Sequence, residues 1–188
     1  MKIVHQAFFA LVLSIVIAPL AGASTITFTT TLDTLQEVPT PNIPSGFDPK
    51  GSGILKLDTT SLLLSWDIEY EGLTGPIVAP GAHLHGPAGP GVTAGVQVWL
   101  AGGPSGVPLP QPASGQLIGS TTITSAQADQ LIAGLWYVNI HTALNPAGEI
   151  RGQVLAIPEP STLGMMGMGG LAVGLFVRHR RRREDRVA

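Results

Sequence analysis

Cysteine is absent from this 188-residue chain, which therefore contains no disulfide framework, no thiolate metal site and no cysteine nucleophile. Charge is scarce, because Asp, Glu, Lys and Arg make up only 12% of the residues, about half the usual share. A G-K-[ST] phosphate loop and a G-x-S-x-G nucleophile elbow are also missing. These absences exclude P-loop nucleotide hydrolases and serine hydrolases of the elbow type.

The few charges are distributed unevenly. Residues 24–157 carry three bases and nine acids, a net charge of −6. Six of the ten bases lie instead at the extreme C-terminus: Arg178, Arg180, Arg181, Arg182, Arg183 and Arg186. An acidic central segment disfavours binding to phosphate backbones, so we expect no nucleic-acid partner.

The N-terminus has the pattern of a secretory signal peptide. Lys2 precedes an apolar run over residues 7–18, and Ala21-Gly22-Ala23 supplies a small-residue cleavage site. The apolar run is too short to span a bilayer comfortably, which disfavours the alternative of an uncleaved membrane anchor. We predict a signal peptide over residues 1–23, and therefore passage through the Sec export machinery and cleavage by signal peptidase.

The C-terminal region, residues 157–188, has three parts in order. Pro158-Glu159-Pro160 is followed by an uncharged, largely apolar segment over residues 161–177, whose length is at the lower limit for a transmembrane helix. The arginine cluster follows: Arg178, Arg180, Arg181, Arg182 and Arg183. Because arginines next to a membrane span stay in the cytoplasm, we predict that residues 161–177 span the inner membrane and that residues 24–157 lie outside the cytoplasm.

This tripartite region resembles the PEP-CTERM sorting signal of Gram-negative bacteria. In that signal a Pro-Glu-Pro motif, a transmembrane helix and an arginine cluster follow one another, as Pro158 to Pro160, residues 161–177 and residues 178–183 do here. The resemblance implies recognition by an exosortase-type transpeptidase and cleavage near the motif. It also implies delivery to the cell surface or to an exopolysaccharide matrix.

The exported segment, residues 24–156, has the composition of short β-strands. Thr and Ile dominate residues 24–35. Residues 62–70 alternate between apolar and polar side chains, which predicts a strand with one buried face and places Trp66 in the core. Further strands are predicted over residues 53–60, 95–101, 116–124, 135–141 and 149–156. Short strands at near-regular spacing predict an all-β sandwich or barrel.

One short helix and two long loops complete this prediction. Ser125 is a candidate N-cap for a helix over residues 126–133, and Gly134 follows its end. Gly and Pro are concentrated in residues 72–81 and 102–115, which we predict to be loops.

Four motifs of the same segment resemble those of the CHRD domain, which is named after chordin and found in many bacterial secreted proteins. They are Gln36-Glu37-Val38-Pro39, Gly51-Ser52-Gly53, Ala82-His83-Leu84-His85-Gly86-Pro87-Ala88, and Tyr137-Val138-Asn139-Ile140-His141-Thr142 with the following Gly148-Glu149-Ile150-Arg151-Gly152-Gln153. The resemblance implies an immunoglobulin-like β fold and leaves the biochemical role undefined.

All three histidines of the exported segment lie in these motifs: His83, His85 and His141. In an extended strand, residues i and i+2 point to the same face, about 6.6–7 Å apart along the chain. Two imidazoles from one strand and a third from another can bind Cu or Zn, and copper and zinc β-barrel proteins use this H-x-H arrangement. Glu149 is a further candidate ligand, or an acceptor that orients a histidine.

The alternative to a metal site is a structural network. In this interpretation the histidines hydrogen-bond across the sheet, and Glu149 pairs with Arg151 two residues along the strand. His141 shares the polar face of its strand with Tyr137 and Asn139, which suits a ligand or a solvated network equally.

Three functions are therefore considered. The first is a non-enzymatic cell-surface or extracellular-matrix domain with an adhesion, assembly or binding role. The second is a histidine-based Cu or Zn protein that binds metal or transfers electrons. The third is a carbohydrate-binding module, with Trp99 as a surface aromatic because it is out of phase with its apolar neighbours.

Overall fold

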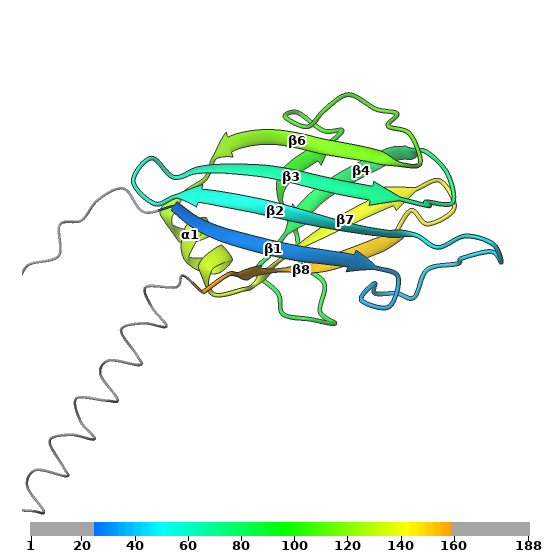
Figure 1. Ribbon diagram of the computed structural model, residues 1–188, viewed down its shortest axis with the longest axis horizontal. Coiled ribbons are helices and arrows are strands. Elements are labelled where there is room, and N and C mark those ends of the chain that lie inside the picture. Colours follow the sequence, from blue (N-terminus) through cyan, green and yellow to red (C-terminus); the bar gives the residue numbers. More distant parts are fainter. Residues whose placement is uncertain (1–24, 159–188) are drawn as a thin grey trace, which may run out of the picture.

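The computed structural model describes residues 25–158 (Figure 1). The predicted signal peptide, Glu159, Pro160, the predicted transmembrane helix over residues 161–177 and the arginine cluster lie outside the described residues. Pro158, the last described residue, is exposed. Residues 25–158 contain no helix that is long and apolar enough to cross a membrane.

Eight strands form one antiparallel sheet. Its members are β1 (Thr25–Asp33), β2 (Lys50–Asp58), β3 (Leu63–Glu71), β4 (Ile77–His85), β5 (Val96–Ala101), β6 (Gly115–Thr122), β7 (Trp136–Thr142) and β8 (Ile150–Ala156). They follow the order β5-β4-β7-β8-β1-β2-β3-β6. The sheet is strongly curled (Figure 1), and its edge strands β5 and β6 contact each other. The all-β prediction is confirmed, in the form of a nearly closed barrel.

The apolar side chains that alternate along β3 pack in the interior of the barrel. Leu64, Trp66, Ile68 and Tyr70 are all buried in the core, which confirms the prediction for Trp66. Trp66 pairs with Gly119 of β6, where an added Cβ atom would lie 2.5 Å from the indole ring. A glycine is therefore needed on β6 to leave room for the tryptophan.

One predicted loop is partly strand. We expected residues 72–81 to form a loop, but β4 begins at Ile77. Its pairing with β7 is irregular between Ile77 and Ala82, and the interruption contains Pro80 and Gly81. Proline lacks an N–H and glycine adopts positive φ, so a Pro-Gly pair in the sequence is typical of a loop. A strand can nevertheless accommodate this pair at a β-bulge. The predicted loop over residues 102–115 is confirmed except for Gly115, where β6 starts.

The helix α1 (Ser125–Ile132) lies between β6 and β7, and its N-cap is Thr124, so the prediction of Ser125 is wrong by one residue. The Thr124 hydroxyl accepts from the Gln127 backbone N–H, and the Gln127 side chain accepts from the Thr124 N–H. This reciprocal capping box places the cap three residues before the glutamine. Gly134, at φ +71°, follows the helix as predicted.

The outer face of β7 is covered, not solvated. All seven residues of β7 are buried. Trp136, Val138 and Ile140 point into the barrel core, and Tyr137, Asn139 and His141 occupy the opposite face. Two connecting segments help to cover that face: the β1–β2 segment, residues 34–49, and the β4–β5 segment, residues 86–95. A second, polar interior thus lies between the barrel wall and these segments.

Candidate functional site

Three histidines meet in this polar interior. On β4, Ala82 and Leu84 belong to the barrel core, so His83 and His85 point to the outer face. His141 joins them from the neighbouring strand β7. Ring centroids are 5.3 Å apart for His83 and His85, 5.0 Å for His83 and His141, and 6.4 Å for His85 and His141. The structure therefore brings together the three histidines that the sequence analysis singled out.

Each imidazole uses one nitrogen in a hydrogen bond to a backbone carbonyl. His83 Nε2 donates to the Pro80 carbonyl at 3.0 Å, His85 Nδ1 to the Ala94 carbonyl at 2.9 Å, and His141 Nδ1 to the Pro146 carbonyl at 3.1 Å. A carbonyl oxygen only accepts, so the bonded nitrogen of each ring carries the proton. In a neutral ring the other nitrogen then has a free lone pair.

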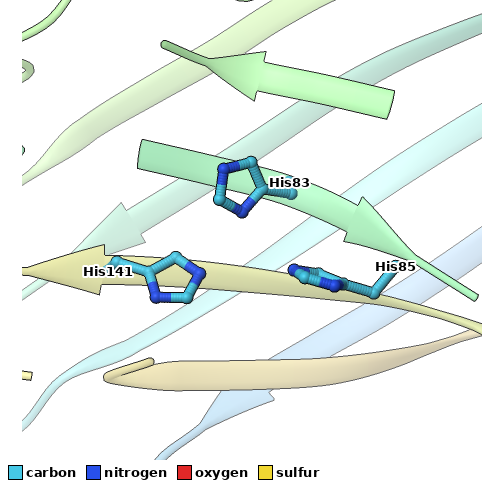
Figure 2. Close-up of side chains that lie close together, drawn as sticks. All are labelled: His83, His85 and His141. Atoms are coloured by element: carbon cyan, nitrogen blue, oxygen red, sulfur yellow. The ribbon is translucent and has the colours of Figure 1, made fainter. Parts of the chain in front are cut away.

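The three remaining ring nitrogens have no hydrogen-bond partner within residues 25–158. They are His83 Nδ1, His85 Nε2 and His141 Nε2, and all are buried. One nitrogen of each ring lies within 4.8 Å of the others, and Figure 2 shows a nitrogen of each ring directed into the space between them. Three atoms no more than 4.8 Å apart lie within about 2.8 Å of a common point, so each ring would move inward by up to about 0.7 Å to reach the ~2.0–2.1 Å of a Zn–imidazole bond.

The electrostatics of the site keep the rings neutral. Burial lowers the pKa of His83 to about 4 and the pKa of His141 to about 4. Burial also lowers the pKa of His85, with a smaller contribution from the charge of Arg151. Near neutral pH no proton therefore competes for the free lone pairs, which is the protonation state that metal binding requires.

Trp99 of β5 closes one side of the cluster. Its indole is half-buried and meets the His83 ring edge to face, with the centroids 4.4 Å apart. Gly103 packs against the same indole. These contacts support placement of the ring within the domain, and sugar stacking by Trp99 stays a prediction.

Tyr137 of β7 packs against the cluster at His85. Its ring stacks on His85 at a centroid distance of 5.0 Å and an angle of 6°. Its hydroxyl accepts from the Ala94 N–H at 3.1 Å, and the Ala94 carbonyl in turn accepts from His85. Tyr137 thus fixes the backbone group that orients His85. Sequence reasoning missed this role, because the contact depends on the course of the β4–β5 segment.

Glu149 lies away from the three rings and is fully buried. Its carboxylate accepts from the Thr74 N–H at 2.6 Å, from the Thr74 and Thr142 hydroxyls at 2.5 Å each, and from the Asn145 amide at 2.9 Å. No ion pair joins it to Arg151 in the described part of the chain, so the predicted pairing of these two residues is wrong. Glu149 instead ties the β3–β4 connection to β7.

Arg151 of β8 is also buried and acts on the β4–β5 segment. Its Nη2 donates to the Gly89 carbonyl at 3.1 Å and to the Val92 carbonyl at 2.9 Å. The guanidinium carbon lies 3.5 Å from the centroid of the Tyr137 ring, a cation–π contact. Arg151 therefore stabilises the β4–β5 segment, whose Ala94 carbonyl accepts the hydrogen bond from His85.

Glu37 of the β1–β2 segment is a buried acid next to the polar interior that contains the histidines. From the sequence we identified it only as part of the Gln36-Glu37-Val38-Pro39 motif. Its Oε1 accepts from the Val38 N–H at 2.9 Å and from the Asn139 amide at 3.4 Å. Burial raises the pKa of Glu37 to about 7, against the smaller opposing effects of these hydrogen bonds and of Arg151. Asn139 pairs with His83 across the sheet, so Glu37 adjoins the histidine site through that residue.

Comparison with known proteins gives two family matches. The CHRD domain matches residues 28–154, and the PEP-CTERM protein-sorting motif matches residues 156–182. No curated protein and no solved structure matches the chain. The sorting motif marks an exported protein that an exosortase sorts. Because the CHRD match covers most of the chain and all three histidines, this protein belongs to the CHRD domain family.

Proposed function

We propose that the exported domain is a metal-binding module, without catalytic activity, that holds one Cu or Zn ion through His83 Nδ1, His85 Nε2 and His141 Nε2. The observation that carries this proposal is the set of three buried, unpartnered ring nitrogens directed toward one point. Buried polar atoms are normally hydrogen-bonded, so three such lone pairs side by side are costly unless a ligand binds them.

The chemistry of the donor set favours these two metals. Neutral imidazole suits Cu and Zn, and a donor set without oxygen ligands does not favour Ca or Mg. By the Irving–Williams order, the site has a higher affinity for Cu²⁺ than for Zn²⁺ when both ions are equally available. The carbonyls of Pro80, Ala94 and Pro146 fix the ring orientations, as outer-shell acceptors do at known metal sites.

A binding role is supported by the limited access to the site. His83 is 2% exposed and His141 is 5% exposed, whereas His85 is half-buried. A substrate would therefore have little direct access to two of the three rings. Glu149 is the acid nearest to His141 along the chain. Its carboxylate accepts from four donors and is therefore not available as a general base.

The proposed route to the surface uses both ends of the chain. Sec and signal peptidase release the N-terminus, the tail holds the precursor in the inner membrane, and an exosortase-type transpeptidase cleaves near Pro158. Pro158 is exposed and lies two residues after the end of β8, so the motif directly adjoins the folded domain. The product is displayed at the cell surface or in an extracellular matrix, where an exopolysaccharide is the proposed neighbour.

Glu159→Ala is expected to leave unprocessed precursor in the membrane fraction. Normal processing of this variant would contradict the proposed route.

The metal proposal is tested on residues 24–157 with His85→Asn. The Asn amide nitrogen takes the place of His85 Nδ1, so the bond to the Ala94 carbonyl is kept while the Nε2 lone pair is removed. We expect one Cu or Zn per wild-type domain by elemental analysis after gel filtration, and loss of at least about 90% of it in H85N, with an unchanged circular dichroism spectrum. A wild-type domain that stays metal-free after incubation with both ions would overturn the proposal.

A further inference from the structure

Among the residues that the structure describes, the Arg151 side chain is a buried cation without an acid partner. It is 1% exposed, and its two hydrogen bonds go to neutral carbonyls, those of Gly89 and Val92. Within residues 25–158 it forms no ion pair, and its Nη1 is buried without a hydrogen-bond partner. Buried charges are usually paired, because desolvation of an unpaired charge is expensive.

Glu37, whose pKa the charge of Arg151 lowers, does not supply that partner. The two side chains interact electrostatically but form no ion pair. Glu37 Oε1 accepts from the Val38 N–H and the Asn139 amide, and Glu37 Oε2 is buried without a hydrogen-bond partner in the described chain. Because no carboxylate of residues 25–158 lies within ion-pair distance of Arg151, the guanidinium lacks a directly bonded anion there.

A pocket of about 250 Å³ adjoins this cation. Leu35 and Val38 of the β1–β2 segment line one side, Pro90 and Gly91 of the β4–β5 segment line another, and Arg151 and Gln153 of β8 complete the wall. Gln153 Nε2 donates to the Ala88 and Gly134 carbonyls, and its Oε1 is buried without a partner in the described chain. Gln36 lines the pocket as well, so its wall combines one cation and two amide side chains with the apolar groups of Leu35, Val38 and Pro90.

We infer that this pocket binds a small monocarboxylate ligand, with Arg151 as the cationic part of its wall. A single guanidinium matches a single carboxylate in charge and in planar geometry. A doubly charged sulfate or phosphate would bring a second charge with no cation to meet it. The Gln153 Oε1 atom accepts from a hydroxyl on the body of the ligand, and Leu35, Val38 and Pro90 pack against its carbon atoms.

The test titrates the full chain, purified in detergent micelles, with D-glucuronate as the probe and with acetate, D-glucose and sulfate for comparison. Chemical shifts of the backbone amides of Gly89, Gly91 and Val92 report occupancy. We expect saturable binding of glucuronate with Kd on the order of 1 mM, weaker binding of acetate, and no saturable shift with glucose or sulfate. Absence of saturation by either carboxylate, or equal shifts with sulfate or glucose, would overturn the inference.

A pair of variants at the pocket rim keeps this test independent of folding. Leu35 is 92% exposed, so polar substitutions there leave the core intact. Leu35→Asp adds a negative charge beside the ligand, and Leu35→Asn is its neutral isostere. We expect glucuronate to bind L35D about five-fold more weakly than L35N, whereas Lys56→Gln on the distant strand β2 changes nothing. Equal affinity of L35D and L35N would contradict a site at this pocket. The outcome does not depend on whether the histidines bind metal.

Discussion

His83 on β4 and His141 on β7 lie with their ring centroids 5.0 Å apart, and each donates to the carbonyl of a proline. They do so with opposite nitrogens: His83 uses Nε2 and His141 uses Nδ1. The free lone pairs are therefore on Nδ1 of His83 and on Nε2 of His141. A shared ion would bind the two rings through different atoms, which is a spectroscopically distinct signature.

Metal binding is expected to persist in mildly acidic solution. Because burial lowers the pKa of both His83 and His141 to about 4, protons compete with the metal only near that pH. A site built from histidines of ordinary pKa, about 6.5, would already lose affinity below pH 6.5. We expect the Kd for Zn at about pH 5.5 to stay within about three-fold of its value at pH 7.5, measured by equilibrium dialysis. A loss of a hundred-fold or more would contradict the neutral, buried cluster.

Tyr137→Phe is expected to weaken metal binding without removing a ligand. The substitution keeps the ring stacked on His85 and under Arg151 but removes the hydroxyl that accepts from Ala94. Loss of an outer-shell contact of this kind lowers metal affinity by about ten-fold, and the free energy of unfolding by about 1–2 kcal/mol.

Tyr70→Phe is the matched control for that experiment. It removes a hydroxyl that donates to the Pro112 carbonyl at 3.2 Å, on β3 and away from the histidines. We expect Y70F to change the free energy of unfolding but not the metal affinity. If competition titrations give Y70F and Y137F the same metal affinity, Tyr137 has no positioning role.

Glu149→Ala is expected to cost about 3–5 kcal/mol of the free energy of unfolding. The substitution leaves the Thr74 N–H, two hydroxyls and the Asn145 amide without their acceptor in a buried place. Glu71→Ala, at an exposed position of β3, is the control and should change stability by less than about 0.5 kcal/mol. Similar urea midpoints for the two variants would refute the structural role of Glu149.

Glu37→Gln is expected to change how stability depends on pH. The pKa of Glu37 is raised from 4.5 to about 7 in the fold, so the folded state binds more protons than the unfolded state between these values. The stabilisation that this group provides is therefore present below pH 4.5 and is lost as pH rises through about 7.

Relative to the wild type, E37Q should accordingly gain stability between pH 5 and pH 8, by on the order of 1–3 kcal/mol. The histidines titrate in the opposite sense, but they are common to both proteins and cancel in the comparison. Urea unfolding of the two metal-free proteins at both pH values measures the difference. An equal difference at pH 5 and pH 8 would show that Glu37 has an ordinary pKa.

The sequence predicted the parts of this fold that are governed by local pattern. The alternation around Trp66 gave the buried face of β3, and the spacing of His83 and His85 placed them on one face of a strand. Gly134 marked the end of α1. In each case a short-range rule decides the outcome, and neighbouring strands only reinforce it.

What could not be predicted depends on how distant segments cover the barrel. Pro80 and Gly81 carry a loop signature, yet they occupy a bulge of β4. Arg151 was expected to pair with the nearby Glu149, but the structure directs it to carbonyls of the β4–β5 segment. Trp99 packs on His83 because the two residues are cross-strand neighbours in the β4–β5 pair. Such contacts join residues far apart along the chain and leave no periodic trace in it.

X-ray absorption spectroscopy of the domain, after incubation with one equivalent of Cu or Zn, tests the three-histidine site most directly. We expect three imidazole nitrogens at about 2.0 Å from the ion, and loss of one imidazole in H85N. A coordination shell of oxygen atoms only, or a shell that H85N leaves unchanged, would contradict the assignment of His83, His85 and His141 as the metal ligands.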